Sequence, residues 1–230
     1  AGETSGQLGV VALTGAEDAS VFKYNSKGER QYIKQLGVVG QVTQGLSVAV
    51  DANLNVYVAG VTTGGLDGGA PVGYTDSFVA KYDSNGVRDL LFTKQWGVAG
   101  ANTSASSVAT DAGGNVYVAG YTTGGLDGST LVGPNRVDFF VTKFDSAGAT
   151  QYTRQLGVDG ADTYGLSVAV DSIRNVFYVA GYTTDGLDGN SKVGTSDLFI
   201  TRYDSGGAKQ YTQQLGVAGV GTYGNSVVVD

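Results

Sequence analysis

Residues 115–120, Asn-Val-Tyr-Val-Ala-Gly, and residues 155–158, Gln-Leu-Gly-Val, decide the fold because both motifs return along the chain at a fixed spacing. The first motif also stands at residues 55–60, and at residues 175–181 with one extra residue. Copies of the second motif, one of them with Trp in place of Leu, lie at residues 35–38, 95–98 and 214–217. The resulting period of about sixty residues is the signature of a repeat architecture.

Each repeat contains four short segments rich in Val, Tyr, Phe and Thr, bounded by Asp, Asn and Gly, and such segments are typical of β-strands joined by tight turns. In one repeat the predicted strands cover residues 46–50, 56–62, 77–82 and 90–96. The first two strands carry Val and Ala on both faces, so both faces of the small sheet must be covered. Sheets that stack face to face around an axis meet this need, and the sequence therefore predicts an all-β fold, a β-propeller.

The two ends of the chain predict how the propeller closes. Residues 9–14 match the second strand of a repeat, whereas residues 225–229 match a first strand with no partner after it. Pairing these ends would remove a free strand edge, and the count of sixteen strands then predicts four blades of four antiparallel strands in one domain, residues 1–230. A stretch of a longer array, or two chains that combine their blades, is the alternative. The predicted blades are residues 9–36 with 225–230, 46–97, 106–157 and 166–216.

The composition excludes several function classes. The net charge of -7 argues against a nucleic-acid partner, and no apolar run is long enough to predict a membrane span or a signal peptide in these residues. Cys, His and Met are absent, which removes the usual thiolate nucleophile and imidazole base and is compatible with a location outside the cell.

Four stretches carry a resemblance to a known family: Ser-Val-Ala-Val-Asp at 47–51, Gly-Asn-Val-Tyr-Val-Ala-Gly-Tyr-Thr at 114–122, Asp-Phe-Phe-Val-Thr-Lys-Phe-Asp at 138–145 and Gln-Leu-Gly at 155–157. This pattern resembles the bacterial SBBP-type β-propeller repeat. The resemblance implies a secreted or cell-surface bacterial protein, often part of a larger one, and it brings no catalytic residue with it.

Long loops are expected to gather on one rim of the propeller, because the connections after the second and fourth strands of every blade lie on the same side. The loops after the second strands are residues 63–75, 123–137 and 184–196, against a short connection, residues 15–17, in the first blade. Loops on a rigid scaffold commonly carry binding residues. The long-loop rim is therefore the predicted contact surface for a protein or glycan partner.

Tyrosines are the first candidate ligand-binding residues on this rim. Their rings stack on sugars and their hydroxyls form hydrogen bonds, although tyrosines at strand ends also serve as packing residues. The candidates are Tyr121, Tyr164, Tyr182 and Tyr223, and Tyr74 falls near the same rim.

Aspartates are the second group of candidates. Asp67, Asp127 and Asp188 stand in repeated Gly-Leu-Asp-Gly loops and could bind Ca²⁺, or could simply form Asp-Gly turns above a buried leucine. A further group of recurring aspartates precedes a basic residue by five positions, which predicts a structural ion pair or hydrogen bonds between blades. Its members are Asp18, Asp76, Asp138 and Asp197.

Every prominent aspartate recurs from repeat to repeat in a turn, whereas catalysis needs one asymmetric cluster. The sequence therefore predicts a non-enzymatic extracellular or cell-surface module for structure or interaction, with no cofactor required and with self-assembly as one form of partnership. A carbohydrate-binding or calcium-dependent propeller is the alternative.

Overall fold

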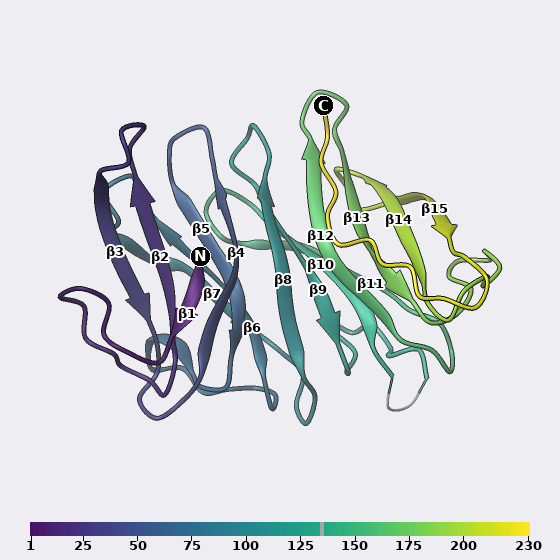
Figure 1. The fold of residues 1–230 in the computed structure, drawn as a ribbon, viewed down its shortest axis with the longest axis horizontal. Helices are drawn as coiled ribbons and strands as arrows, with labels where there is room; N and C mark the ends of the chain where they lie inside the picture. The colour runs from purple at the N-terminus through teal and green to yellow at the C-terminus, as the bar shows by residue number, and fades with distance from the viewer. Residues whose placement is uncertain (134–135) are drawn as a thin grey trace. The chain divides into compact units, whose positions relative to one another are not determined.

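The computed structural model describes residues 1–133 and 136–230 as an all-β chain (Figure 1). Its strands form four antiparallel sheets in which neighbours in sequence pair with one another, as in the blades of a β-propeller. Three sheets have four strands and the first has three, which gives fifteen strands among the described residues. Residues 134–135, in the predicted loop 123–137, lie outside the described residues.

The sheets follow the chain in order. The first contains β1 (Gly2–Thr4), β2 (Asp18–Tyr24) and β3 (Arg30–Leu36). The second contains β4 (Thr43–Val50), β5 (Val56–Thr62), β6 (Asp76–Tyr82) and β7 (Arg88–Trp96). The third contains β8 (Thr103–Thr110), β9 (Val116–Thr122), β10 (Asp138–Phe144) and β11 (Thr150–Leu156). The fourth contains β12 (Thr163–Asp171), β13 (Val176–Thr183), β14 (Asp197–Asp204) and β15 (Lys209–Leu215).

The chain divides into two compact units, Ala1–Val108 and Ala109–Asp230, each with its own core. In unit 1, small and branched side chains of β2 pack on β5 and β6, around Val21, Val58 and Phe78. In unit 2 the core is more aromatic, and Phe139, Phe177 and Phe199 are fully buried. These cores lie between neighbouring sheets, as the two-faced apolar pattern of the strands predicts.

The predicted strand at residues 9–14 is wrong, because the second strand of the first sheet is β1. Gly2 lies opposite Ser20, and Thr4 lies opposite Asp18. In the second sheet, Gly60 and Thr62 of β5 pair with β6 in the same register. The opening Ala-Gly-Glu-Thr is thus the counterpart of Ala-Gly-Val-Thr at residues 59–62. Residues 5–17 form the loop after this strand, so the first sheet has a long loop in place of the predicted short connection.

The extra residue in the third copy of the Asn-Val-Tyr motif lengthens a hairpin and does not form a bulge. The pairing of β13 with β14 runs without a register shift from Val176 to Thr183. The hairpin between β12 and β13 gains one pair, Asp171 opposite Val176.

The C-terminal segment, residues 221–230, contains no strand. It nevertheless takes the position that the first strand of a further repeat would occupy. Val227 N–H donates to Ser167 Oγ at 3.1 Å in unit 2, as Val108 N–H donates to Ser47 Oγ in unit 1. Ring closure by residues 225–229 and the division into four blades stay predictions, with β1 in place of residues 9–14 as the opening strand.

Candidate functional site

A buried aspartate holds the long loop of each sheet to its outermost strand. Asp76 is fully buried at the start of β6 and accepts hydrogen bonds from Val72 N–H, Gly73 N–H and Gln95 Nε2, at 2.7–2.8 Å. Gln95 in turn accepts the N–H of Leu66 through Oε1. We call this Asp–Gln pair the latch. It fixes the loop from both ends, because the aspartate binds the end of the loop and the glutamine its beginning.

The latch recurs in every sheet. The other pairs are Asp18 with Gln35, Asp138 with Gln155, and Asp197 with Gln214. The predicted ion pairs between these aspartates and the basic residues five positions later do not form, because the carboxylates bind loop N–H groups and glutamine instead. The alternative, hydrogen bonds between sheets, is seen at two of the four basic residues, because Lys23 and Lys143 donate to the carbonyls of Ser84 and Ser205 within their own units.

Four tyrosines form a continuous aromatic row in unit 2, which we call the tyrosine row. Tyr121 is the last residue but one of β9, Tyr164 is the second residue of β12, and Tyr182 is the last residue but one of β13. Tyr223 lies in the C-terminal segment. Neighbouring ring centroids are 5.0, 4.8 and 4.8 Å apart, and the middle pair, Tyr164 and Tyr182, is stacked. The structure thus brings together all four tyrosines that the sequence singled out.

The chemistry of the tyrosine row combines ring surface with hydrogen-bonding groups. Tyr223 is 53% exposed at one end of the row, and the other three rings are half-buried. Burial and the negative charge of Asp162 raise the pKa of Tyr164, and burial and the neighbouring tyrosines raise that of Tyr182. Their phenols therefore remain protonated at neutral pH and can donate hydrogen bonds.

The carboxylate of Asp162 places a negative charge beside the tyrosine row. The Asp162 backbone is held by two hydrogen bonds with Thr184, and the carboxylate lies 3.9 Å from Arg136. The carboxylate is partly exposed, so it can accept hydrogen bonds from a ligand. In unit 1 the positions that correspond to Tyr164 and Tyr182 are Gln44 and Val61, and the row has no counterpart there.

The calcium candidates do not converge on a cation site. Asp67, Asp127 and Asp188 adopt left-handed backbone conformations in their loops, as Asp-Gly turns require. Their carboxylates bind Arg88, Thr153 and Lys209 of the outer strands. Among residues 1–133 and 136–230, no three His, Cys, Asp or Glu side chains gather to hold a metal.

Each of the three carboxylates is held by a side chain of an outer strand, whereas Ca²⁺ takes six to eight oxygen ligands. We expect calorimetric titration with Ca²⁺ to about 1 mM, the range of weak extracellular sites, to give no heat beyond dilution. Binding heat that Asp127→Ala removes, with the fold unchanged by circular dichroism, would contradict this prediction and restore the calcium alternative.

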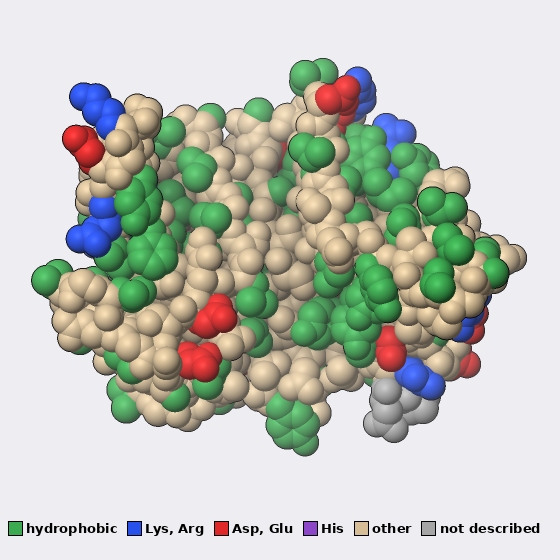
Figure 2. Space-filling view, viewed as in Figure 1, with side chains coloured by type: hydrophobic (Ala, Val, Ile, Leu, Met, Phe, Trp, Pro, Cys, Tyr) green, Lys and Arg blue, Asp and Glu red, His purple; other side chains and the backbone are tan. Residues whose placement is uncertain are grey.

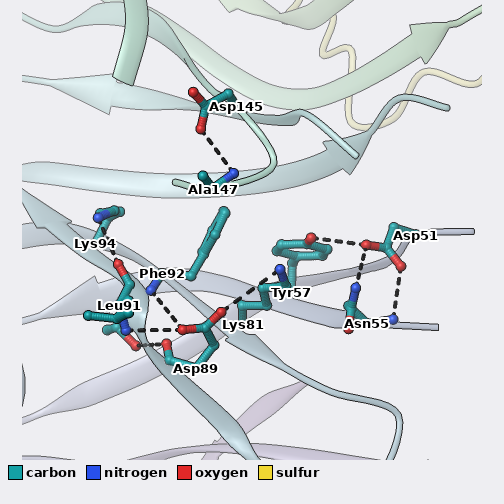
Figure 3. A network of polar contacts seen from close by, with 11 residues as sticks. Asp51, Asn55, Tyr57, Lys81, Asp89, Leu91, Phe92, Lys94, Asp145 and Ala147 are labelled. Atoms are coloured by element: carbon teal, nitrogen blue, oxygen red, sulfur yellow. Dashed lines mark hydrogen bonds and ion pairs between the residues drawn. The ribbon is translucent and has the colours of Figure 1, made fainter. Parts of the chain in front are cut away.

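The polar residues of the turn after β4 form hydrogen bonds within their own hairpin (Figure 3). Asp51 accepts hydrogen bonds from the backbone and side chain of Asn55 and from the hydroxyl of Tyr57. Lys81 lies 3.9 Å from Asp89 and 5.2 Å from the ring centroid of Phe92. Although burial acts to raise it, the pKa of Asp51 is lowered by its hydrogen bonds from Asn55 and Tyr57. This network stabilises the hairpin and holds the Tyr57 ring in place.

The sequence reasoning missed the latch and the true opening strand, although signals for both were present. A glutamine recurs in the fourth strand of every repeat, 17 to 19 residues after the buried aspartate. Gly6 and Leu8 have the same spacing as Gly64 and Leu66, and Leu8 N–H binds Gln35 as Leu66 N–H binds Gln95.

Four meandering antiparallel sheets, each with a latched loop between its second and third strands, define a β-propeller protein. A family model described as a β-propeller repeat, SBBP, matches residues 31–67, 91–127 and 151–188, and each match runs from an outer strand into the next Gly-rich loop. The chain is a member of the SBBP β-propeller repeat family.

A curated relative, the regulatory protein FlaEY of Caulobacter vibrioides, is 30% identical in an alignment 179 residues long that covers 72% of this chain. The chain spans only 17% of the length of that relative. Among solved structures, the WD40 repeats of RRP9 match with 11% identity and a TM-score of 0.31, covering 92% of this chain and 78% of that one. No helix in the described part of the chain is both long and apolar enough to span a membrane.

Proposed function

We propose that this chain is a non-enzymatic interaction module that acts outside the cell and binds its ligand at the tyrosine row. The observation that carries the proposal is the row itself, because it breaks the symmetry of the repeats. The latches and turn aspartates recur from sheet to sheet and bind the backbone around them, whereas the row occurs in unit 2 alone.

Two further features support an interaction role. The latches hold the long loops in fixed positions, and a rigid surface loses little conformational entropy on binding. The name of the relative FlaEY describes a regulatory protein, and regulation commonly works through binding. The placement outside the cell rests on the SBBP repeats, and a chain without cysteine is compatible with it.

A glycan is the ligand class that the row favours. The exposed Tyr223 offers ring surface to the apolar face of a sugar, the phenols of Tyr164 and Tyr182 donate hydrogen bonds, and the Asp162 carboxylate accepts them from sugar hydroxyls. A flat apolar protein surface would use the rings but would offer no hydrogen-bond donor to the Asp162 carboxylate.

A glycan array tests this proposal. We expect the wild-type chain to bind a defined set of glycans, and Tyr164→Ala and Tyr223→Ala to reduce that binding at least about fivefold, since an aromatic contact contributes about 1 kcal/mol or more. Tyr74→Ala is the matched control, because Tyr74 is 69% exposed in unit 1 and lies outside the row. A blank array removes the glycan proposal. Equal loss with Tyr74→Ala would contradict the assignment to the row.

A further inference from the structure

An acidic side chain stands beside the tyrosine row at a position where the two units differ. In unit 2 the backbone of Asp162 forms two hydrogen bonds with Thr184, one with its hydroxyl and one with its N–H. In unit 1 the backbone of Val42 forms the same two hydrogen bonds with Thr63. The local backbone is therefore shared, whereas the side chain changes from an apolar valine to a carboxylate.

The aromatic rings and the carboxylate occur together in unit 2. Tyr164 lies directly opposite Tyr182 on the neighbouring strand. In unit 1 the residues in this register are Gln44 and Val61, and that unit also lacks the carboxylate. Because the repeat folds in the same way without these three side chains, the fold does not explain why they occur together, and a ligand that uses both does.

The negative charge of Asp162 acts on the rings of the row. Burial raises the pKa of Tyr164 and of Tyr182, and the charge of Asp162 adds to both shifts. The Asp162 carboxylate is 30% exposed, so a ligand can reach it. Figure 2 shows hydrophobic side chains gathered on the visible face of unit 2 beside the C-terminal segment, with acidic and basic side chains next to them. A group bound against these rings therefore lies in the field of a negative charge.

A protonated amine is the ligand group that meets both features. The face of an aromatic ring attracts cations, and an ammonium group near a carboxylate gains a further electrostatic attraction. An ammonium also offers three N–H donors and no acceptor, whereas a carboxylate and a phenol oxygen both accept hydrogen bonds. The rings and the acid thus favour the same chemical group.

We propose that the tyrosine row selects glycans that carry a protonated amine, with the ammonium against the rings of Tyr164 and Tyr182 and beside the Asp162 carboxylate. This inference rests on the proposed function, in which a glycan binds at the row, and it adds the charge of the sugar.

Arg136 is the cation that competes with the ligand for Asp162. Its guanidinium is 42% exposed and lies 3.9 Å from a carboxylate oxygen of Asp162, which is beyond hydrogen-bonding distance. The carboxylate can therefore accept hydrogen bonds from an incoming ammonium group. Removing the charge of Arg136 is expected to strengthen the binding of a cationic sugar, and removing the charge of Asp162 is expected to weaken it.

A matched pair of sugars tests the proposal with the full chain. A glucosamine trisaccharide and its N-acetylated form share one backbone and differ in their amino groups. At about pH 6, below the pKa of an aliphatic amine, the first is cationic and the second is neutral. We expect calorimetry to show about tenfold tighter binding of the cationic sugar, through a cation–π contact and an exposed ion pair. Salt should reduce this preference, because it screens exposed charges.

Variants of the chain identify the groups responsible. Asp162→Asn should reduce the preference about threefold, since the ion pair is lost. Arg136→Gln should increase the preference. Asp145→Asn is the matched control, because it removes the same charge from a surface turn of unit 2 in which Asp145 binds the N–H groups of Ala147 and Ala149. It should leave the preference unchanged.

The outcomes separate this inference from the proposed function. Equal binding of the two sugars, or an equal loss of preference with Asp145→Asn, would overturn the inference and leave glycan binding at the row intact. Tighter binding of a galacturonic acid trisaccharide would also overturn it and would assign the charge selectivity to Arg136. No binding of any glycan, by a chain that circular dichroism shows to be folded, would overturn both.

Discussion

Replacing Gly97 by alanine is expected to lower the free energy of unfolding by about 3 kcal/mol, the upper range for forcing an extra methyl into a packed interior. A Cβ atom on Gly97 would lie 2.0 Å from Oδ1 of Asp76 and 2.9 Å from its Cγ, far inside contact distance. Asp76 cannot yield, because it is fully buried and held by Val72, Gly73 and Gln95. The added methyl must therefore open the latch.

Thermal unfolding measures this effect. For a chain of this size, 3 kcal/mol corresponds to a fall in Tm of about 6–12 °C. Gly6→Ala is the control, because no atom lies within 4 Å of a Cβ placed there. A Gly97→Ala variant as stable as Gly6→Ala would show that the latch adapts and that the recurring Gln-Leu-Gly motif has another cause.

The same close contact explains the motif that fixed the repeat length. Gly37, Gly157 and Gly216 each place a Cβ position within 2 Å of the latch aspartate of their own sheet. The glutamine two residues earlier is the other half of the latch. The motif therefore recurs because each sheet contains the same close contact between this glycine and its latch aspartate.

Strand positions were predictable where the pattern of side chains is regular. The predicted strand at residues 56–62 coincides with β5, and the prediction for β6 began one residue late. The first strand of that sheet begins at Thr43, three residues before its predicted start, because Gln44 and Gly45 resemble a loop in sequence. Gly45 is nonetheless in the sheet, opposite Gly60, just before an irregularity in the pairing of β4 with β5.

The first sheet was mispredicted for a different physical reason. Its second strand is represented by Gly2–Thr4 alone, too short to show the alternation that identifies a strand. Val10 and Val11 offered a more apolar stretch, but Val10 is 96% exposed in the loop. The identity of β1 lies in its register on β2, which only the three-dimensional arrangement reveals.

The candidate site was predictable in its members but not in its geometry. The strand ends placed Tyr121, Tyr164, Tyr182 and Tyr223 on one rim, and the structure brings their rings into contact. Contacts between side chains of successive sheets depend on how the sheets stack, which a linear repeat does not encode residue by residue. The partners of Asp67, Asp127 and Asp188 escaped prediction for the same reason.

Replacing Asp197 by asparagine is expected to lower the free energy of unfolding by about 3 kcal/mol at pH 7, because hydrogen bonds to a buried charge are strong and the amide NH₂ would face other donors. Asp197 is fully buried and accepts hydrogen bonds from Val193 N–H, Gly194 N–H and Gln214 Nε2. Burial acts to raise the pKa of this carboxyl, but the three hydrogen bonds together with Lys192 lower it below its usual value.

The lowered pKa gives the effect a definite pH dependence. A carboxyl whose pKa is lower in the folded chain than the unfolded value of about 3.9 stabilises the fold fully above that value. The contribution is lost as the pH falls through the folded pKa. The difference in stability between wild type and Asp197→Asn should therefore be constant from pH 7 to about pH 5 and should narrow below about pH 4.

Urea unfolding across this pH range checks the prediction, with Asp145→Asn as the control. Asp145 caps a surface turn through Ala147 and Ala149, and asparagine serves equally well in such turns. A difference for Asp197→Asn that stays constant down to pH 2 would show that shape, and not charge, holds the latch. Convergence in acid would mean instead that the negative charge of the buried Asp197 carboxylate fastens the long loop of the fourth sheet to its outer strand.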